Sequence, residues 1–206
     1  MTLACSVDQG PCVVSRHGDV LIEGIEPWLG EPLPEERAVL DRAIAPVLDV
    51  GCGPGRHVLE LASRGVVALG VDAAPNAVRV AHGRGAPVLQ RSIFEELPGA
   101  GRWETALLLD GSIGIGGDPG ALLRRVASLL RGGGRVLVEV EGPEVGVCPM
   151  TARIESGSDV SPWFPWALVG VDGLASLAAA SGYRVQETWM DCDRWFASLL
   201  VHGERG

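Results

Sequence analysis

The sequence predicts an α/β protein whose parallel sheet is covered by helices on both faces. Three short apolar runs, at 47–50, 66–71 and 86–90, are separated by two segments with helical spacing of apolar residues. The runs do not alternate between polar and apolar residues as half-exposed strands do. Continuous apolar runs are typical of parallel strands that are buried on both faces. A chain of 206 residues with 47% hydrophobic residues is long enough for one domain with a sizeable core.

A glycine-rich turn joins the first strand to the first helix. Glycines stand at positions 51, 53 and 55, and helical periodicity resumes at Arg56. Glycine allows positive φ and lets the backbone lie close to a ligand, because no Cβ intrudes. A dinucleotide-binding fingerprint would need its third glycine at position 56. The arginine there makes the loop a poorer fit for a pyrophosphate.

The loop resembles motif I of class I S-adenosylmethionine-dependent methyltransferases, which is an apolar run, an acid and Gly-x-Gly-x-Gly. The matching segment is Leu48-Asp49-Val50-Gly51-Cys52-Gly53-Pro54-Gly55. A second match is Asp72, at the end of the next strand, where that family keeps an acid for the ribose hydroxyls of its cofactor. Charge-assisted hydrogen bonds of this kind are about twice as strong as neutral ones.

The elements after the loop follow the same family order. They are a strand at 104–109, a helix at 121–130, a Gly-Gly turn into a strand at 136–140, a helix at 171–180, and strands at 183–189 and 195–201 joined as a hairpin. The resemblance covers about residues 40–203 and implies a three-layer sandwich. Its seven-stranded, mostly parallel sheet would have an antiparallel last strand. It also implies S-adenosyl-L-methionine as the cofactor.

Carried over residue by residue, the resemblance implies a cofactor site of eleven residues: Asp49, Gly51, Cys52, Gly53, Gly55, Asp72, Ala73, Ser92, Ile93, Asp110 and Gly111. The sequence departs from the family after the third strand, where Arg91 or Ser92 replaces the usual acid. Ser92 is expected either to contact the adenine or simply to close the turn. Cys52 is expected to be a small residue chosen for fit.

Asp110 and His57 are the candidate catalytic residues, with His17 as a further candidate base. Asp110 follows the fourth strand, and ligands of open α/β sheets bind outside the carboxyl ends of strands. It is expected to bind the cofactor ammonium, to accept a proton, or only to bond backbone N–H groups of the turn. His57 begins a helix, and it is expected either to act as a neutral base or to pack over the cofactor.

Two segments stand outside the resemblance, an N-terminal extension at 1–40 and an insertion at 141–170. No strand is predicted in residues 1–20, and residues 35–45 are predicted to form a helix. Glu26 and Trp28 either line the site or attach the extension. The insertion is predicted to be irregular and carries Trp163, Phe164 and Trp166, which form either a lid over an apolar or cationic substrate or a local core.

Composition limits the classes of binding partner and indicates a cellular compartment. The net charge is −9, which argues against a binder of nucleic acid or of anionic membranes. No apolar run is long enough to cross a bilayer, and no secretion signal is expected. Five widely spaced cysteines without a Cys-x-x-Cys pair indicate reduced thiols in a cytoplasmic protein. The sequence leaves a homodimer open.

The predicted activity of this single domain, 1–206, is methyl transfer from S-adenosylmethionine to an oxygen or nitrogen nucleophile of a small molecule. An NAD(P)-dependent oxidoreductase would share the sheet and Asp72, although the arginine at position 56 counts against it. A non-catalytic protein of the same fold would bind the cofactor without turnover. No metal site is predicted, because the loop of Asp110 offers no second carboxylate or asparagine nearby. The identity of the acceptor is left open.

Overall fold

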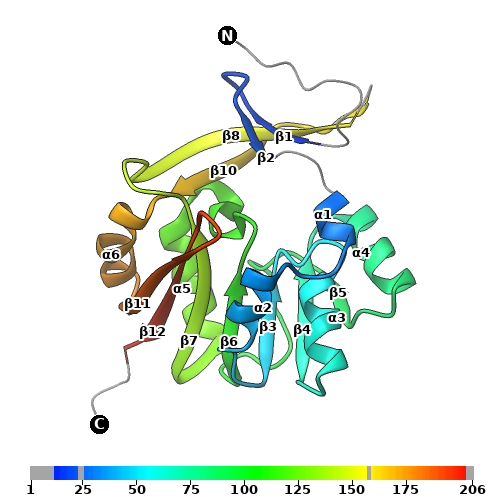
Figure 1. Cartoon of the computed structure of the whole chain (residues 1–206), viewed down its shortest axis with the longest axis vertical. Coiled ribbons are helices and arrows are strands. Elements are labelled where there is room, and N and C mark those ends of the chain that lie inside the picture. The colour runs from blue at the N-terminus through cyan, green and yellow to red at the C-terminus, as the bar shows by residue number, and fades with distance from the viewer. Residues whose placement is uncertain (1–11, 23–25, 157–158, 203–206) are drawn as a thin grey trace.

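The main sheet has seven strands in the order β11-β12-β7-β6-β3-β4-β5. The computed structural model describes residues 12–22, 26–156 and 159–202 (Figure 1). The strands are β3 (Val47–Val50), β4 (Ala68–Asp72), β5 (Val88–Gln90), β6 (Trp103–Leu108), β7 (Leu130–Val140), β11 (Tyr183–Asp191) and β12 (Arg194–Val201). β3 to β7 pair in parallel, whereas β12 is antiparallel to both β7 and β11. The predicted seven-stranded sheet with an antiparallel seventh strand is confirmed.

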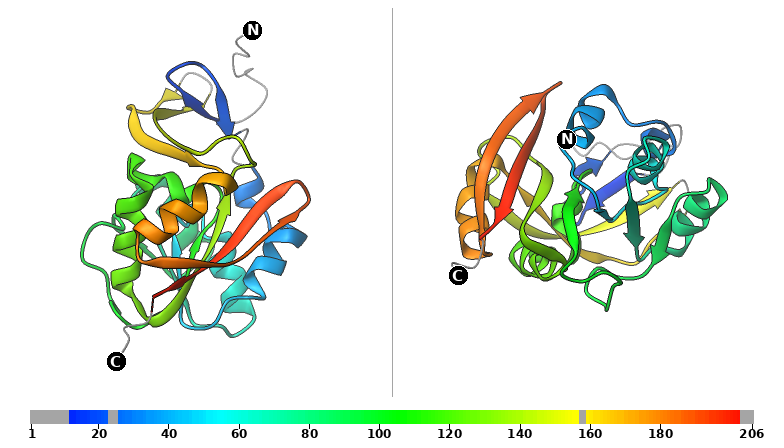
Figure 2. Two further views of the ribbon diagram at one scale, coloured as in Figure 1. Left: turned by 90° about the vertical axis from the view of Figure 1, so that its left-hand side faces the viewer. Right: turned by 90° about the horizontal axis from the view of Figure 1, so that it is seen from below.

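Helices cover both faces of this sheet (Figure 2). They are α1 (Glu26–Leu29), α2 (Pro34–Leu40), α3 (Arg56–Ser63), α4 (Pro75–Gly83), α5 (Pro119–Leu129) and α6 (Val171–Ala180). Side chains of α5 and α6, such as Leu122 and Leu174, belong to one hydrophobic cluster. Side chains of α2, α3 and α4, such as Leu40, Leu61 and Val78, belong to two others. None of the helices in the described ranges is long and apolar enough to span a membrane.

The helix predicted over 35–45 is shorter than expected and ends at Leu40. Thr105 of β6 explains the early end. Its hydroxyl accepts a hydrogen bond from the Ile44 amide at 2.9 Å and donates one to the Ile44 carbonyl at 2.8 Å. The backbone of Ile44 is therefore bound to the sheet instead of a helix, and Pro46 then leads into β3.

A second, antiparallel sheet lies across the edge of the main sheet where the parallel strands end (Figure 1). Its order is β10-β8-β1-β2, and β9 pairs with β8. The strands are β1 (Cys12–Ser15), β2 (Val20–Ile22), β8 (Val147–Ser156), β9 (Asp159–Val160) and β10 (Phe164–Val169). The prediction of an irregular stretch at 141–170 was therefore wrong, and β1 and β2 lie in a segment for which the sequence supported no strand prediction. Pairs such as Val13 with Ile154 join segments far apart in sequence, and no local pattern reveals such pairing.

The described cysteines differ in oxidation state. Cys12, in β1, is disulfide-bonded, so the expectation that every cysteine is reduced was wrong at this position. Cys52, Cys148 and Cys192 are free.

The second sheet packs against the 3₁₀ helix η1 (Ser112–Gly117), which follows β6. A Cβ on Gly114 would clash with the carbonyl oxygen of Ala167 in β10 and would lie 3.0 Å from the Ala167 nitrogen. The backbones of η1 and β10 thus meet with no room for a side chain. Only glycine fits at position 114.

We predict that Gly114→Ala lowers the free energy of unfolding by about 1–3 kcal/mol, the usual cost of overpacking. The clash is with backbone, which cannot rotate away as a side chain can. Urea unfolding of wild type and variant measures this cost. Gly132→Ala is the matched control, since a Cβ there would meet no atom within 4 Å. Equal losses in the two variants would contradict the close contact.

Candidate active site

Four carboxylates gather at the edge where the parallel strands end. Asp49 lies in β3, Asp72 ends β4, Asp110 follows β6 by two residues, and Glu139 is near the end of β7. The strand order reverses between β3 and β6, and the glycine loop begins at the end of β3. Open α/β sheets bind their ligands at this place.

Asp72 holds the glycine loop in shape. Its Oδ2 accepts a hydrogen bond from the Gly53 amide at 2.8 Å, and its Oδ1 accepts one from the Ala74 amide at 2.7 Å. Gly51, Gly53 and Gly55 all have positive φ, between 52° and 82°. A Cβ on Gly53 would meet no atom within 4 Å, so space remains beside the loop. The loop is therefore a preformed backbone cradle with a carboxylate at its side.

Cys52 is buried in this loop and packs against the sheet. A Cβ on Gly70 of β4 would lie 2.6 Å from its sulfur. Burial raises the pKa of the Cys52 thiol far above its usual value. Cys52 is thus a protonated, space-filling residue, in agreement with the expected small residue chosen for fit.

The Arg56 side chain is buried and joins two carboxylates from different elements. Its Nη2 donates to Oε1 of Glu36 in α2 at 2.7 Å and to Oδ2 of Asp110 at 2.6 Å. Arg56 is only 3% exposed. Buried charges of this kind are stable only when paired.

Arg194, at the start of β12, completes the same group. Its Nη1 donates to Oε1 of Glu36 at 2.6 Å, and its Nε and Nη2 each donate to the Glu139 carboxylate at 2.8 Å. A two-point contact between guanidinium and carboxylate fixes geometry as well as charge. Glu139 Oε2 also accepts the amide of Asp110 at 2.8 Å. We call Glu36, Arg56, Asp110, Glu139 and Arg194 the ionic cluster.

His57 lies behind the ionic cluster and is almost completely buried. Its Nε2 is 3.6 Å from Glu36 Oε2 and its Nδ1 is 3.9 Å from Asp49 Oδ2, both ion-pair distances. Burial alone would lower the pKa of His57, but the carboxylates of Glu36 and Asp49 outweigh it and raise the pKa. Burial also raises the pKa of Asp49 to about 6.

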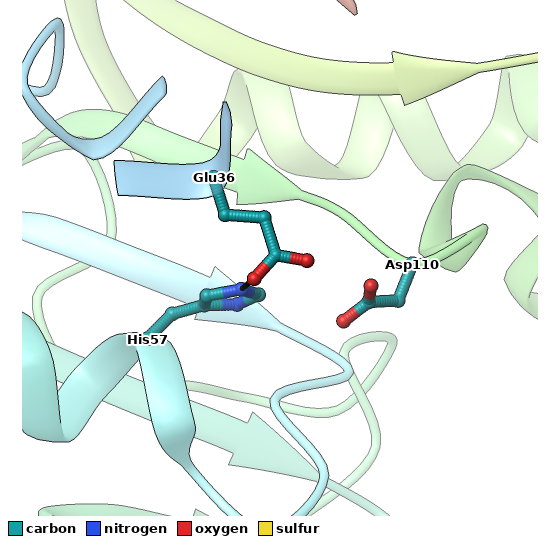
Figure 3. A group of neighbouring side chains, drawn as sticks. All are labelled: Glu36, His57 and Asp110. Atoms are coloured by element: carbon teal, nitrogen blue, oxygen red, sulfur yellow. Dashed lines mark ion pairs between the residues drawn. The ribbon is translucent and has the colours of Figure 1, made fainter. Parts of the chain in front are cut away.

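Glu36, His57 and Asp110 offer ligand atoms within 4.8 Å of one another (Figure 3). That spacing would suit a divalent cation. However, Arg56 donates to both carboxylates, and Arg194 contacts them as well. Two guanidinium groups already supply the positive charge that a metal would bring.

Two adjoining cavities open beside the ionic cluster. The larger, of about 180 Å³, is lined by Leu21, Trp28, Asp110, Gly111, Glu139, Glu141, Trp166 and Leu168. The smaller, of about 120 Å³, shares Gly111, Glu139, Glu141 and Leu168 and extends to Arg194 and Trp195. Both lie between the main sheet and the second sheet. Asp110 lines the larger cavity, whereas His57 lines neither.

The aromatic residues of the insertion divide between two roles. Trp166 lines the larger cavity together with Trp28 of α1, which agrees with the lid alternative for the insertion and with the site-lining alternative for Trp28. Trp163 faces Arg153, whose guanidinium carbon is 4.5 Å from its ring centre, and lines neither cavity. Phe164 packs edge-on against Trp166 at 5.9 Å. The side chain of Glu26 lies outside the described part of the chain.

Ser92 and His17 are engaged in local turns. The Ser92 amide donates to Glu95 Oε2 at 2.7 Å, and the Ser92 hydroxyl accepts from the Phe94 amide at 3.3 Å. Ser92 thus closes the turn after β5, one of its two expected roles. His17 is exposed in the β1–β2 turn, and its amide donates to Ser15 Oγ at 3.2 Å.

The sequence interpretation missed Glu36, Glu139, Glu141 and Arg194 as site residues. Glu36 lies in the N-terminal extension, and Arg194 lies more than 150 residues further along the chain. One available signal was that Glu139 interrupts an otherwise apolar strand, 136–140. A charge inside a buried strand needs a partner.

The fold and the site define a class of protein, a Rossmann-like α/β enzyme with a glycine loop and an acid at the second strand. A family model described as a methyltransferase domain matches residues 29–188, which is most of the chain. The chain therefore belongs to this methyltransferase family. The resemblance to class I S-adenosylmethionine-dependent methyltransferases is confirmed.

Two solved structures illustrate the relationship. A methyltransferase from Bacteroides fragilis, solved with S-adenosyl-L-homocysteine, has 25% identity and a TM-score of 0.79 over 94% of this chain and 88% of its own. The 1,6-didemethyltoxoflavin-N1-methyltransferase of Burkholderia thailandensis has 19% identity and a TM-score of 0.61 over 86% and 81% of the two chains. The second likeness is one of fold alone.

A curated relative matches over a short segment. The 2-heptyl-1-hydroxyquinolin-4(1H)-one methyltransferase of Mycobacteroides abscessus is 43% identical over 60 residues. This match covers 28% of the chain and 26% of that relative. The match thus spans about a quarter of the relative's length.

We predict that Arg194→Met destabilises the protein by about 3–5 kcal/mol, because it leaves the buried carboxylate of Glu36 and that of Glu139 short of a partner. Arg64→Met is the control, since Arg64 pairs with Glu60 and Asp41 at the surface, where such pairs contribute about 0–1 kcal/mol. Denaturant unfolding compares the two variants. A loss for Arg194→Met no larger than that for Arg64→Met would contradict a structural role for the ionic cluster.

The raised pKa of His57 predicts a pH dependence of stability. A histidine whose pKa is higher in the folded state contributes stability below its unfolded pKa, and this contribution is lost as the pH rises through the folded value. The free energy of unfolding should therefore fall from about pH 6.5 upward. His57→Gln should flatten that fall, while the exposed His17→Gln should leave it unchanged. Denaturant unfolding curves measured at several pH values above and below about 6.5 test this prediction. If the free energy of unfolding falls with pH as steeply in His57→Gln as in wild type, the prediction is wrong.

Proposed function

We propose that this protein transfers the methyl group of S-adenosylmethionine to an oxygen or nitrogen nucleophile of a small molecule. One juxtaposition carries the proposal. The glycine cradle bound to Asp72 is connected to the wall of the larger cavity, since Arg56, the residue after the cradle, donates to Asp110, which lines that cavity together with Gly111. A cofactor site and an acceptor site must adjoin for a methyl group to pass directly between two molecules.

The cofactor would lie with its amino-acid arm over Gly51 to Gly55 and its ribose on Asp72. Each Asp72 oxygen accepts one backbone amide, and a carboxylate oxygen has a second lone pair for a hydroxyl. The proposed contacts are those of the eleven predicted residues: Asp49, Gly51, Cys52, Gly53, Gly55, Asp72, Ala73, Ser92, Ile93, Asp110 and Gly111. Bound there, S-adenosylmethionine would supply the electrophilic methyl group.

The residues of the chain contribute mainly alignment. Holding two reactants in near-attack geometry can supply about 7–11 kcal/mol of a barrier. Arg56 fixes the Asp110 carboxylate, which would form the wall between methyl donor and acceptor and contact the cofactor ammonium. His57 is proposed as a positioning residue, since it touches the ionic cluster and neither cavity.

A small acceptor suits cavities of about 120 and 180 Å³. Two relatives support this by their names, because one acts on a hydroxyquinolone and the other on didemethyltoxoflavin. A cytoplasmic location and a homodimer stay predictions, as does the organisation of residues 1–206 as one domain.

We predict that the protein binds S-adenosylmethionine and S-adenosylhomocysteine, and that Asp72→Ala weakens this binding by about 1.5–3 kcal/mol, the value of hydrogen bonds to a charged group. Titration calorimetry measures both. The control is Asp41→Ala, since Asp41 is an exposed residue whose carboxylate pairs with Arg64. Folded wild-type protein that binds neither nucleoside at high micromolar concentration would overturn the proposed function, and unchanged affinity in Asp72→Ala would move the ribose contact elsewhere.

A further inference from the structure

The walls of the larger cavity carry three acids and no base. Asp110, Glu139 and Glu141 line it, and no arginine, lysine or histidine does so among the residues described. The rest of the wall includes two indoles, Trp28 and Trp166. A site with this lining repels anions and favours a molecule that combines positive charge with an apolar body.

The three acids are not equivalent, because two of them are paired with guanidinium groups. Arg56 donates to Asp110, and Arg194 donates twice to Glu139. Both guanidinium groups belong to the ionic cluster, outside the lining of the larger cavity. No hydrogen bond or ion pair joins the Glu141 side chain to another described residue. Glu141 is therefore the acid of this cavity whose side chain pairs with no cationic group among the described residues.

Glu141 is held in place by its backbone. Its amide donates to the Val169 carbonyl at 2.8 Å, and its carbonyl accepts from the Val171 amide at 2.9 Å. These bonds fix the residue just beyond β7, where the second sheet rejoins the main sheet. Glu141 lines both cavities, as does Gly111 next to Asp110. A free carboxylate on a fixed backbone thus stands at the junction of the two cavities.

We propose that the methyl acceptor is an amine on an aromatic or apolar body, with its nitrogen on the Glu141 carboxylate and its body between Trp28 and Trp166. This rests on the proposed function and deepens it. Glu141 is exposed to solvent, and partial desolvation together with the negative charge of the neighbouring Glu139 raises the pKa of its carboxyl, which suits a group that must take up a proton. The N–H donor and the indole walls give the acceptor its orientation.

The reaction balances with the groups named. Glu141 accepts a proton from the ammonium form of the acceptor, which leaves a neutral amine with a free lone pair. The amine nitrogen forms a bond to the methyl carbon while the carbon–sulfur bond breaks, and its electron pair stays on sulfur. The products are S-adenosylhomocysteine and the N-methylated acceptor in its ammonium form, and the exposed Glu141 releases the accepted proton to solvent.

Calorimetry on the full chain saturated with S-adenosylhomocysteine tests the proposal. The probes are 2-phenylethylamine, 2-phenylethanol and phenylacetate, which share a body and differ in charge. We expect the amine to bind at least about tenfold more tightly than the alcohol, and phenylacetate to bind most weakly. Glu141→Gln should cost the amine about tenfold in affinity and leave the alcohol and S-adenosylhomocysteine unaffected. The exposed Glu144→Gln, three residues along and lining neither cavity, should change nothing.

The outcomes separate this inference from the proposed function. Failure of S-adenosylhomocysteine to bind would overturn both. Normal binding of S-adenosylhomocysteine with no preference for the amine, or with an amine affinity unchanged in Glu141→Gln, would overturn the inference alone. An equal loss in Glu144→Gln would also overturn it, because the charge effect would then be general rather than a property of this cavity.

Discussion

The pairing of Arg56 and Arg194 with buried carboxylates is the interaction on which the rest of the structure depends. Each guanidinium contacts acids from at least two elements, so the ionic cluster ties α2, α3, β7, β12 and the turn after β6 together. Removing two charges from water is costly, and the cost is offset only when partners and hydrogen bonds are complete. The buried charges are therefore all paired only when these elements are packed in this one arrangement.

That arrangement sets the geometry of both proposed subsites. Arg56 is the first residue of α3, directly after the glycine loop, and it binds the acid that follows β6. The contact between Arg56 and Asp110 thus fixes the distance between the cofactor cradle and Asp110. Arg194 does the same for Glu139 on the acceptor side. The ionic cluster pairs two of the three acids of the larger cavity with guanidinium groups, and Glu141 is left without such a partner among the described residues.

Much of the fold followed from local patterns in the sequence. Apolar runs, helical spacing and glycine punctuation located the main strands and helices, and the family resemblance supplied the antiparallel last strand. The loop and Asp72 were found together because both lie next to a strand end. The second sheet was missed because its pairs, such as Val13 with Ile154, join segments that carry no local signal of one another. Glu36 and Arg194 were missed for the same reason, since their partners are distant in sequence.

A crystal structure of the protein with S-adenosylhomocysteine would test the central claim most directly. The account predicts the amino-acid arm over Gly51 to Gly55, both ribose hydroxyls on the Asp72 carboxylate, and the sulfur facing Gly111 with the contact between Arg56 and Asp110 intact. A nucleoside bound elsewhere, or bound with that contact broken and Asp72 turned away from the sugar, would contradict it.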